Sequence, residues 1–173
     1  MVIGLIGKAG CGKSTAANAL CREYGFIRIG FADAIKQTLF TLGLFSHNEL
    51  WNKKTEKSRQ AMQEFGEWVR RYDYMFWTDK CYQKILELRQ AQYHDIVIDD
   101  VRRIDEAEMI QRIGGKLVRI FRDSLDTITD YSHISETEMD EISTNYIIRN
   151  NDTILQLQSE IIDIARREEE GRC

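Results

Sequence analysis

The sequence predicts an α/β fold with a parallel sheet and helices on both of its faces. Two observations carry this prediction. Short apolar segments alternate along the chain with longer segments that have helical spacing. Polar residues suited to ligand binding follow the apolar segments, as they do where parallel strands end at one edge of a sheet. With 173 residues, 43% of them hydrophobic, the chain is expected to form one domain, residues 1–173, with a substantial core.

The first predicted strand, Val2–Ile6, is short, apolar and partly β-branched. Gly7–Ser14 follows with the pattern G-x-x-x-x-G-K-S, and an alanine-rich helix begins near Lys13. In this arrangement, backbone N–H groups of the loop and the positive end of the helix dipole bind a phosphate chain. A glycine-rich turn without a ligand is the alternative, and the complete pattern in the right context argues against it.

The loop therefore predicts a nucleoside triphosphate site. Lys13 is expected to reach the β and γ phosphates, and the Ser14 hydroxyl to bind Mg²⁺. The expected triphosphate contacts are Gly7, Ala9, Gly10, Cys11, Gly12, Lys13, Ser14 and Thr15.

Residues 26–30 form the second predicted strand, and a helix follows with apolar residues at positions 31, 35, 39 and 42. Asp33 stands where this helix begins. Its commoner role is to complement the helix dipole. A contact with a substrate sugar or base at the carboxyl edge of the sheet is the functional alternative.

Residues 55–92 are charged, poor in helix breakers and predicted to be helical, with a kink or a close contact at Gly66, their only glycine. Arg59, Gln63, Gly66 and Arg70 are four, three and four positions apart, so they share one helical face. A small residue between two arginines suits a helix that approaches a phosphate closely. In an arbitrary helix, such arginines are more often simply solvated.

The third predicted strand, residues 94–100, ends in Asp99 and Asp100, and such an acid is what a phosphate-loop enzyme needs for Mg²⁺. Arg102 and Arg103 follow at the same edge of the sheet. A helix over 105–113 closes with two glycines, and the fourth predicted strand, 116–121, precedes Arg122.

Residues 123–137 are polar and predict a mobile loop, with a short helix from Ser135 to about Asp140. The fifth predicted strand is 146–148. The last helix is expected to begin at Asp152 or Thr153, and residues 167–173 are expected to fray.

The composition of the whole chain restricts its partners and location. A net charge of −4 argues against a nucleic acid polymer as partner, so an anionic small substrate needs locally clustered arginines. No apolar run is long enough for a membrane span, and the N-terminal residues lack a signal-peptide pattern. The four cysteines are scattered, which is typical of reduced thiols in a cytoplasmic protein. A homodimer is left open.

Taken together, these segments resemble the bacteriophage-type deoxynucleoside monophosphate kinases, relatives of adenylate kinase. The resemblance covers nearly the whole chain and rests on the order and spacing of its motifs. After the phosphate loop, the matching residues are Phe31–Lys36, Arg59, Gln63, Gly66, Arg70, Trp77, Asp100-Val101-Arg102, Gly114–Lys116, His133–Glu136 and Asn150 or Asn151. The family usually continues Asp-Val-Arg with Phe-Pro-Asn-Glu, whereas this chain has Arg103–Glu106.

The resemblance implies a three-layer α/β/α P-loop kinase fold with a five-stranded parallel sheet. It also implies a helical insertion that binds the nucleoside monophosphate, about 34–92, and a short lid, about 123–137. The implied reaction is transfer of the γ-phosphoryl group of ATP to a deoxynucleoside 5′-monophosphate (dNMP) with Mg²⁺, for which no general base is required. A cytoplasmic location, the host cytoplasm for a viral protein, follows from it.

The resemblance also implies the site residues. Lys13, Arg102 and Arg122 are the catalytic residues, Ser14 and Asp100 bind Mg²⁺, and Arg119 and Asn150 join the phosphate loop around ATP. The acceptor residues are Asp33, Lys36, Arg59, Gln63, Phe65, Arg70, Asp100, Arg102 and Glu136. Asp99 remains the alternative to Asp100, Arg103 the alternative to Arg102, and Trp68 the alternative to Phe65. His133 belongs either to lid closure or to an ordinary loop.

Two other functions stay open. One is a kinase for another small phosphorylated metabolite, such as a dephospho-coenzyme A-like acceptor. The other is a non-catalytic P-loop nucleotide-binding module, against which the absence of an N-K-x-D motif argues.

Overall fold

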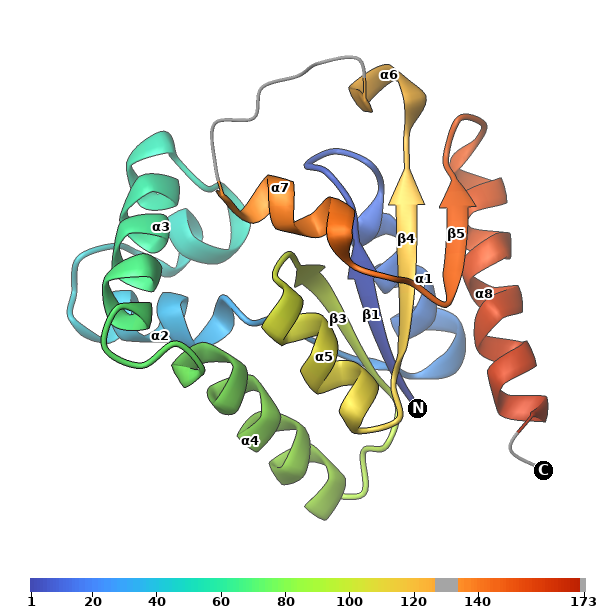
Figure 1. Cartoon of the computed structure of the whole chain (residues 1–173), viewed down its shortest axis with the longest axis horizontal. Coiled ribbons are helices and arrows are strands. Elements are labelled where there is room, and N and C mark those ends of the chain that lie inside the picture. The colour runs from blue at the N-terminus through green and yellow to red at the C-terminus, as the bar shows by residue number, and fades with distance from the viewer. Residues whose placement is uncertain (127–133, 172–173) are drawn as a thin grey trace.

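The computed structural model describes residues 1–126 and 134–171, without the side chains of Ser124, Asp126 and residues 134–137. Within these residues, five parallel strands form one sheet in the order β2-β3-β1-β4-β5 (Figure 1). The strands are β1 (Val2–Ile6), β2 (Ile27–Ile29), β3 (Ile96–Val101), β4 (Lys116–Phe121) and β5 (Tyr146–Arg149). The predicted parallel sheet is confirmed.

Strand β1 lies at the centre of this sheet and is buried along its whole length. Gly4 pairs with Ile98 of β3 on one side and with Leu117 of β4 on the other. A Cβ atom on Gly4 would lie 2.7 Å from the Cδ1 of Ile110, so a helix packs directly on the strand here. The loop that follows β1 therefore opens at the middle of the carboxyl edge.

Helices cover both faces of the sheet (Figure 1). On one face, α1 (Lys13–Tyr24) and α8 (Ile154–Glu170) bury a core with Ile3 and Leu5 of β1. On the other face, Val2 and Ile6 of the same strand pack with residues of α4, α5 and α7. This alternation is the two-residue period of a strand buried on both sides. The bounds of these helices are α4 (Phe76–Gln90), α5 (Ile104–Arg112) and α7 (Ile134–Glu141).

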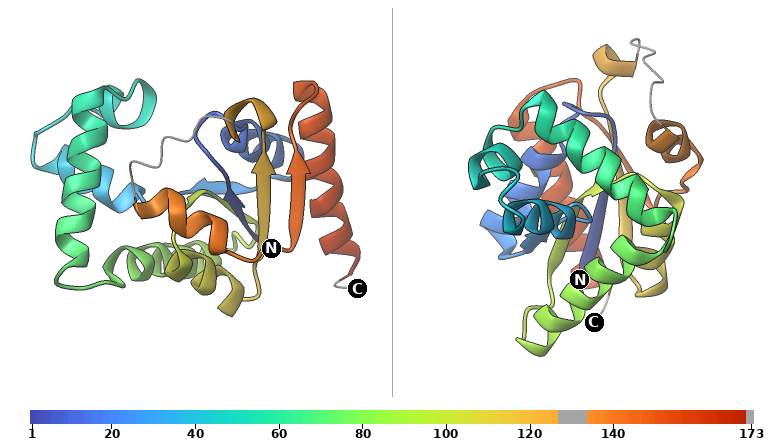
Figure 2. Two further views of the ribbon diagram at one scale, coloured as in Figure 1. Left: turned by 45° about the horizontal axis from the view of Figure 1, so that its top comes forward. Right: turned by 90° about the vertical axis from the view of Figure 1, so that its left-hand side faces the viewer.

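A further group of helices connects β2 to β3 and lies at the opposite end of the molecule from α8 (Figure 2). Its first members are α2 (Asp33–Thr41), the π-helix η1 (Asn48–Asn52) and α3 (Glu56–Arg70). They enclose a small core of their own around Leu39, Phe45 and Leu50. We call residues 33–90, from α2 to α4, the insertion.

The predicted continuous helical stretch 55–92 is divided in two. Helix α3 ends at Arg70 and α4 begins at Phe76. The break lies at 71–75, where the Asp73 carboxylate accepts a hydrogen bond of 3.2 Å from the N–H of Met75. Gly66 lies within α3 without interrupting it, and a Cβ there would lie 3.1 Å from Ile35 Cδ1. Its role is a close contact, not a kink.

Two smaller predictions are also corrected. The expected loop 123–137 contains a one-turn helix, α6 (Asp123–Asp126), and α7 already begins at Ile134. Helix α8 continues to Glu170 beyond the point where fraying was expected. Residues 127–133, with His133, lie outside the described residues. In the part of the chain that the structure covers, none of the helices has both the length and the apolar character of a membrane span.

Candidate active site

The loop between β1 and α1 is shaped by its glycines. Gly12 has a φ of 111°, and a Cβ there would lie 2.6 Å from the Asn150 amide nitrogen. Gly7 has a φ of 151°, and a Cβ there would lie 2.6 Å from the Cys11 sulfur. Such angles and spacings exclude side chains. Asn150 Nδ2 also donates a hydrogen bond of 2.8 Å to the Cys11 carbonyl. Asn150, directly after the end of β5, thus supports the phosphate loop.

The Lys13 ammonium folds back over this loop. Its Nζ donates to the carbonyl oxygens of Gly7, at 2.5 Å, and Lys8, at 2.8 Å. Burial lowers the pKa of Lys13, because the charged form loses water contacts inside the loop. The cation is therefore held at the concave side of the loop, where it can exchange carbonyl oxygens for phosphate oxygens. Thr15 lies two residues after Lys13, in the first turn of α1.

The hydroxyl of Ser14 makes its contact with Asp99. Ser14 Oγ donates to Asp99 Oδ2 at 3.2 Å, and Arg28 bonds to both groups. Neighbouring ligands of an octahedral Mg²⁺ with bonds of about 2.1 Å are about 3 Å apart, so this oxygen pair fits the ion. Among the described residues, no cluster of three or more His, Cys, Asp or Glu side chains could hold a metal. Mg²⁺ here would need phosphate and water oxygens as well.

The neighbouring acid, Asp100, has different partners. Its partly buried carboxylate accepts hydrogen bonds from the N–H groups of Phe31, at 2.8 Å, and Ala32, at 3.0 Å. Burial raises the pKa of Asp100, and these two N–H groups oppose the rise. Asp100 thus fixes the turn between β2 and α2. The resemblance implies that Asp100 binds Mg²⁺ together with Ser14, but the acid that contacts Ser14 is Asp99, the alternative.

A cleft of about 350 Å³ lies between the phosphate loop and the insertion. The predicted stripe on α3 forms one wall, since Arg59, Gln63, Gly66 and Arg70 all line the cleft. Ala9 of the phosphate loop lines it too. The other lining residues include Phe31, Ala32, Ile35, Lys54, Met62, Trp77, Asp100, Arg102, Arg103 and Glu106.

Three of the cations in this cleft are not neutralised by carboxylates. Within the described residues, Lys54, Arg59 and Arg102 form no ion pair. Partial burial lowers the pKa of Lys54, and the nearby positive charges of Lys36, Arg59 and Arg102 lower it further, against Asp100. Cations that repel one another in this way attract an anionic ligand. Lys54 was not predicted, because it lies outside the helical stripe.

Arg70 was expected to hold an anion, but its charge is neutralised within the fold. Its guanidinium pairs with Asp105 at 3.1 Å and Glu106 at 3.0 Å, and all three side chains are buried. Glu106 also accepts from the N–H groups of Arg102, at 2.8 Å, and Arg103, at 3.2 Å. Burial, and then the charge of Asp100, raise the pKa of Glu106 to about 8.

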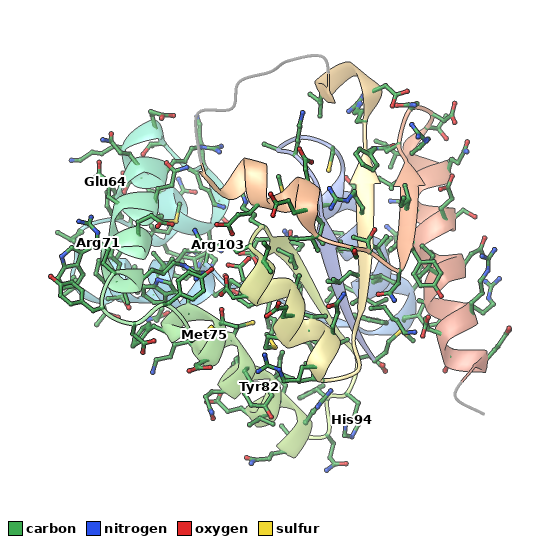
Figure 3. All side chains as sticks on the ribbon, viewed as in Figure 1. Glu64, Arg71, Met75, Tyr82, His94 and Arg103 are labelled. Atoms are coloured by element: carbon green, nitrogen blue, oxygen red, sulfur yellow. The ribbon has the colours of Figure 1, made fainter. Side chains whose placement is uncertain are left out.

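Arg103 lies at the start of α5, on the side of that helix toward α3, whereas Glu64 lies on the outer side of α3 (Figure 3). The Arg103 guanidinium pairs with Glu67 at 2.9 Å and Glu138 at 3.4 Å. Arg103 therefore joins α3, α5 and α7, while Arg102 stays available in the cleft.

The remaining predicted residues have mixed positions. Asp33 accepts from the Gly30 N–H at 2.7 Å and pairs with Lys36 at 2.7 Å, which is the helix-start role. Phe65 does not line the cleft; its ring packs 5.8 Å from that of Trp77 and 6.2 Å from that of Trp68, whereas Phe31 does line it.

The two arginines around β4 also differ. Arg119 is buried and donates to the carbonyl oxygens of Met139 and, at 2.8 Å, Ile142, so it anchors the end of α7. Arg122 is exposed and borders a small hollow with Gly7 and Lys8. The side chain of Glu136 lies outside the described residues.

Comparison with known proteins decides the family. The family model described as "Deoxynucleotide monophosphate kinase" matches residues 44–161. The chain belongs to the deoxynucleotide monophosphate kinase family. A curated relative in Acanthamoeba polyphaga mimivirus, named "Putative deoxynucleotide monophosphate kinase", is 30% identical over an alignment of 184 positions that covers 94% of each chain. The resemblance inferred from the sequence is confirmed.

Solved structures show the fold of this deoxynucleotide monophosphate kinase family member. Dephospho-CoA kinase from Campylobacter jejuni has a TM-score of 0.59 at 17% identity, with coverage of 99% of this chain and 98% of the other. Shikimate kinase from Aquifex aeolicus has a TM-score of 0.53 at 16% identity, with 99% of both chains covered. The predicted P-loop kinase fold is therefore confirmed, and family and fold together support a nucleotide kinase.

The family match begins at residue 44, after the phosphate loop. The assignment of Gly7–Ser14 thus rests on its pattern and on the geometry above. Sequence reasoning missed the contacts of Arg28, the orientation of Lys54 and the buried Glu106. Only Glu106 left a signal, since it stands three residues after Arg103 at a helix start, the spacing of a capping box.

Proposed function

We propose that this protein transfers the γ-phosphoryl group of ATP to the α-phosphate of a deoxynucleoside 5′-monophosphate and so supplies precursors for DNA synthesis. The observation that carries the proposal is that one cleft joins the phosphate loop, through Ala9, to Arg59 and Arg102, two cations without an ion pair in the described part of the chain. A donor site and a second anion site therefore adjoin each other. A module that only binds a nucleotide would not need the second site.

The reaction needs position and charge more than proton transfer. An oxygen of the acceptor phosphate, already ionised, attacks the γ phosphorus, and the bond from that phosphorus to the bridging oxygen of ADP breaks. Two polyanions must be brought into line, so the main obstacle is their mutual repulsion. Cations along the cleft reduce this repulsion.

On this proposal each group has a defined task. Lys13 and the N–H groups of the loop hold the β and γ phosphates of ATP. Ser14 and Asp99 would hold Mg²⁺, which supplies positive charge to the β and γ oxygens when bound. Arg59, Arg102 and Lys54 hold the acceptor phosphate. Arg122, at the border of the phosphate loop, is assigned to the transferring group.

Arg70 and Glu106 act through other residues in this scheme. Glu106 holds the backbone N–H of Arg102 and the guanidinium of Arg70, so the pair fixes the wall from which Arg102 projects. The base and sugar of the acceptor are assigned to the part of the cleft that Phe31 and Gly66 line.

The decisive experiment measures phosphorylation of a panel of acceptors by the purified full chain. The panel holds the four dNMPs, the four ribonucleoside monophosphates and dephospho-coenzyme A, each with ATP and Mg²⁺. We expect turnover with at least one dNMP and very slow ATP hydrolysis without an acceptor. Lys13→Ala is the control for contaminating kinases.

Other results of the panel point elsewhere. If dephospho-coenzyme A alone is phosphorylated, it takes the place of the dNMP as the acceptor in this proposal. ATP binding without any transfer would favour a nucleotide-binding module.

We also assign the protein to the cytoplasm, of a host cell if it is viral. Its mimivirus relative and the free thiols of Cys11, Cys21 and Cys81 support this assignment.

A further inference from the structure

Arg28 occupies a position that the proposed reaction does not explain. It lies in β2, and its guanidinium extends to the first turns of α1. One nitrogen donates to Asn18 Oδ1 at 3.0 Å. The other donates to Ser14 Oγ at 3.1 Å and is in contact with the carboxylate of Asp99. With the bond from Ser14 to Asp99, the three side chains close a ring of hydrogen bonds.

This ring contains both protein oxygens that fit Mg²⁺. The Arg28 side chain is 37% exposed and that of Asp99 is 14% exposed, so the carboxylate is partly withdrawn from water and the arginine is its cation. A divalent ion that binds Asp99 must displace the guanidinium or lie close beside it. Either event opposes metal binding, because like charges repel and the arginine loses a partner.

The protein offers little to offset this cost. Within the described residues, no larger group of metal-binding side chains gathers, so a free ion would gain only two protein oxygens. The situation changes when a triphosphate is present, since it brings several oxygens for the metal and negative charge for the arginine. The bond to Asn18 gives the guanidinium a second partner when it leaves Asp99.

We propose that Arg28 competes with free Mg²⁺ for Ser14 and Asp99, so that the metal binds well only together with the nucleotide. The inference rests on the proposed function for the role of the metal site. It assigns Arg28 as a positioning residue for the metal ligands. The arginine keeps Asp99 and Ser14 oriented in the nucleotide-free protein and prevents early occupation of the site by a metal ion.

The test measures binding of Mn²⁺, as a probe for Mg²⁺, to the nucleotide-free full chain by the electron paramagnetic resonance of the unbound ion. Arg28→Met should lower the Kd for Mn²⁺ by about tenfold or more relative to the wild type. Arg28→Gln is the second variant, in case Arg28→Met does not fold by circular dichroism. Asp99→Ala combined with either change should abolish the gain, which locates the ion.

Arg22→Met is the matched control. It removes an arginine from α1 that is 61% exposed and pairs with its neighbour Glu23. If it tightens Mn²⁺ binding as much as Arg28→Met does, general charge is the cause and the proposal is wrong. The proposal is equally wrong if the Arg28 variants bind Mn²⁺ no better than the wild type.

The outcome is independent of the acceptor. A tenfold gain with no dNMP turnover in the acceptor panel would leave Arg28 as inferred and overturn the reaction alone. Turnover of dNMPs with unchanged Mn²⁺ binding would overturn only the role of Arg28.

Discussion

Asp99 and Asp100 are adjacent in β3, and their carboxylates accept hydrogen bonds on opposite faces of the sheet. Asp99 lies on the side of α1, where it accepts from Ser14, and Asp100 lies on the other side, under the N–H groups of Phe31 and Ala32. The alternation of side chains along a strand separates them. One acid is thus available to a metal, and the other stabilises the backbone next to the cleft.

The two acids should therefore respond differently to removal. We expect Asp99→Ala to raise the Mg²⁺ concentration for half-maximal activity by about tenfold or more, with a small effect on stability. Asp100→Ala should lower the free energy of unfolding by about 1–3 kcal/mol, because two partly buried N–H groups lose their acceptor. The dependence of activity on Mg²⁺ concentration measures the first effect, and urea denaturation measures the second. A shifted Mg²⁺ requirement in Asp100→Ala alone would return the metal to Asp100.

Arg59→Ala should weaken the acceptor site without weakening the fold. Within the described residues the Arg59 side chain has no ion pair to lose, so the free energy of unfolding should change by less than about 0.5 kcal/mol. Its KM for the dNMP should rise by about tenfold or more, because a charge-assisted contact with the phosphate is lost. Arg71→Ala, an exposed arginine next to the end of the same helix, is the control and should leave KM unchanged.

Arg70→Ala should act mainly on stability. Its removal takes the guanidinium away from the buried side chains of Asp105 and Glu106 and leaves Asp105 with the longer contact to Arg103, at 3.6 Å. Loss of one partner of a buried ion pair typically costs about 3–5 kcal/mol. Urea denaturation monitored by tryptophan fluorescence measures this loss. If Arg70→Ala instead folds as well as the wild type and loses only dNMP affinity, Arg70 binds the acceptor directly, as the sequence first suggested.

The pH dependence of stability should report on Glu106. Burial and the charge of Asp100 raise the pKa of Glu106 in the folded chain to about 8, whereas its ordinary value is 4.5. Between these two pH values, the folded state therefore binds more protons than the unfolded state. The contribution of Glu106 to stability therefore falls as the pH rises from about 4.5 to about 8. Glu106→Gln cannot ionise and should lack this fall.

Urea denaturation of the wild type and of Glu106→Gln at several pH values between 5 and 8.5 measures the difference. Glu64→Gln, on the outer surface of α3, is the control and should follow the wild type. A difference between wild type and Glu106→Gln that stays constant with pH would mean that Arg70 keeps the carboxylate ionised throughout.

The parts of the fold that depend on local pattern were predictable from the sequence. The strand, loop and helix around Gly7–Ser14 need only neighbouring residues, and so does the shared face of Arg59 and Gly66 on α3. The parallel direction of the strands follows from their alternation with helices. Even the break between α3 and α4 involves local contacts, but residues 71–75 lack glycine and proline, so no breaker announced it.

The parts of the site that depend on distant partners were not predictable. Arg70 has the same spacing as Arg59, yet only Arg70 meets Asp105 and Glu106, which lie 35 and 36 residues away in the chain. The choice between Asp99 and Asp100 depends on which face of β3 meets α1. The spacing of residues in the sequence indicates neither the partners of Arg70 nor the face of β3 that meets α1.

The order of the strands separates two kinds of change in this protein. Strands β2 and β3 are neighbours in the sheet, and the whole insertion, residues 33–90, lies in the connection between them. Substitutions, or changes of loop length, within that connection reshape one wall of the cleft while β1, its loop and α1 keep their places. On the proposed function, variation in one continuous third of the chain could therefore change the acceptor without altering the part that is assigned to the phosphate donor.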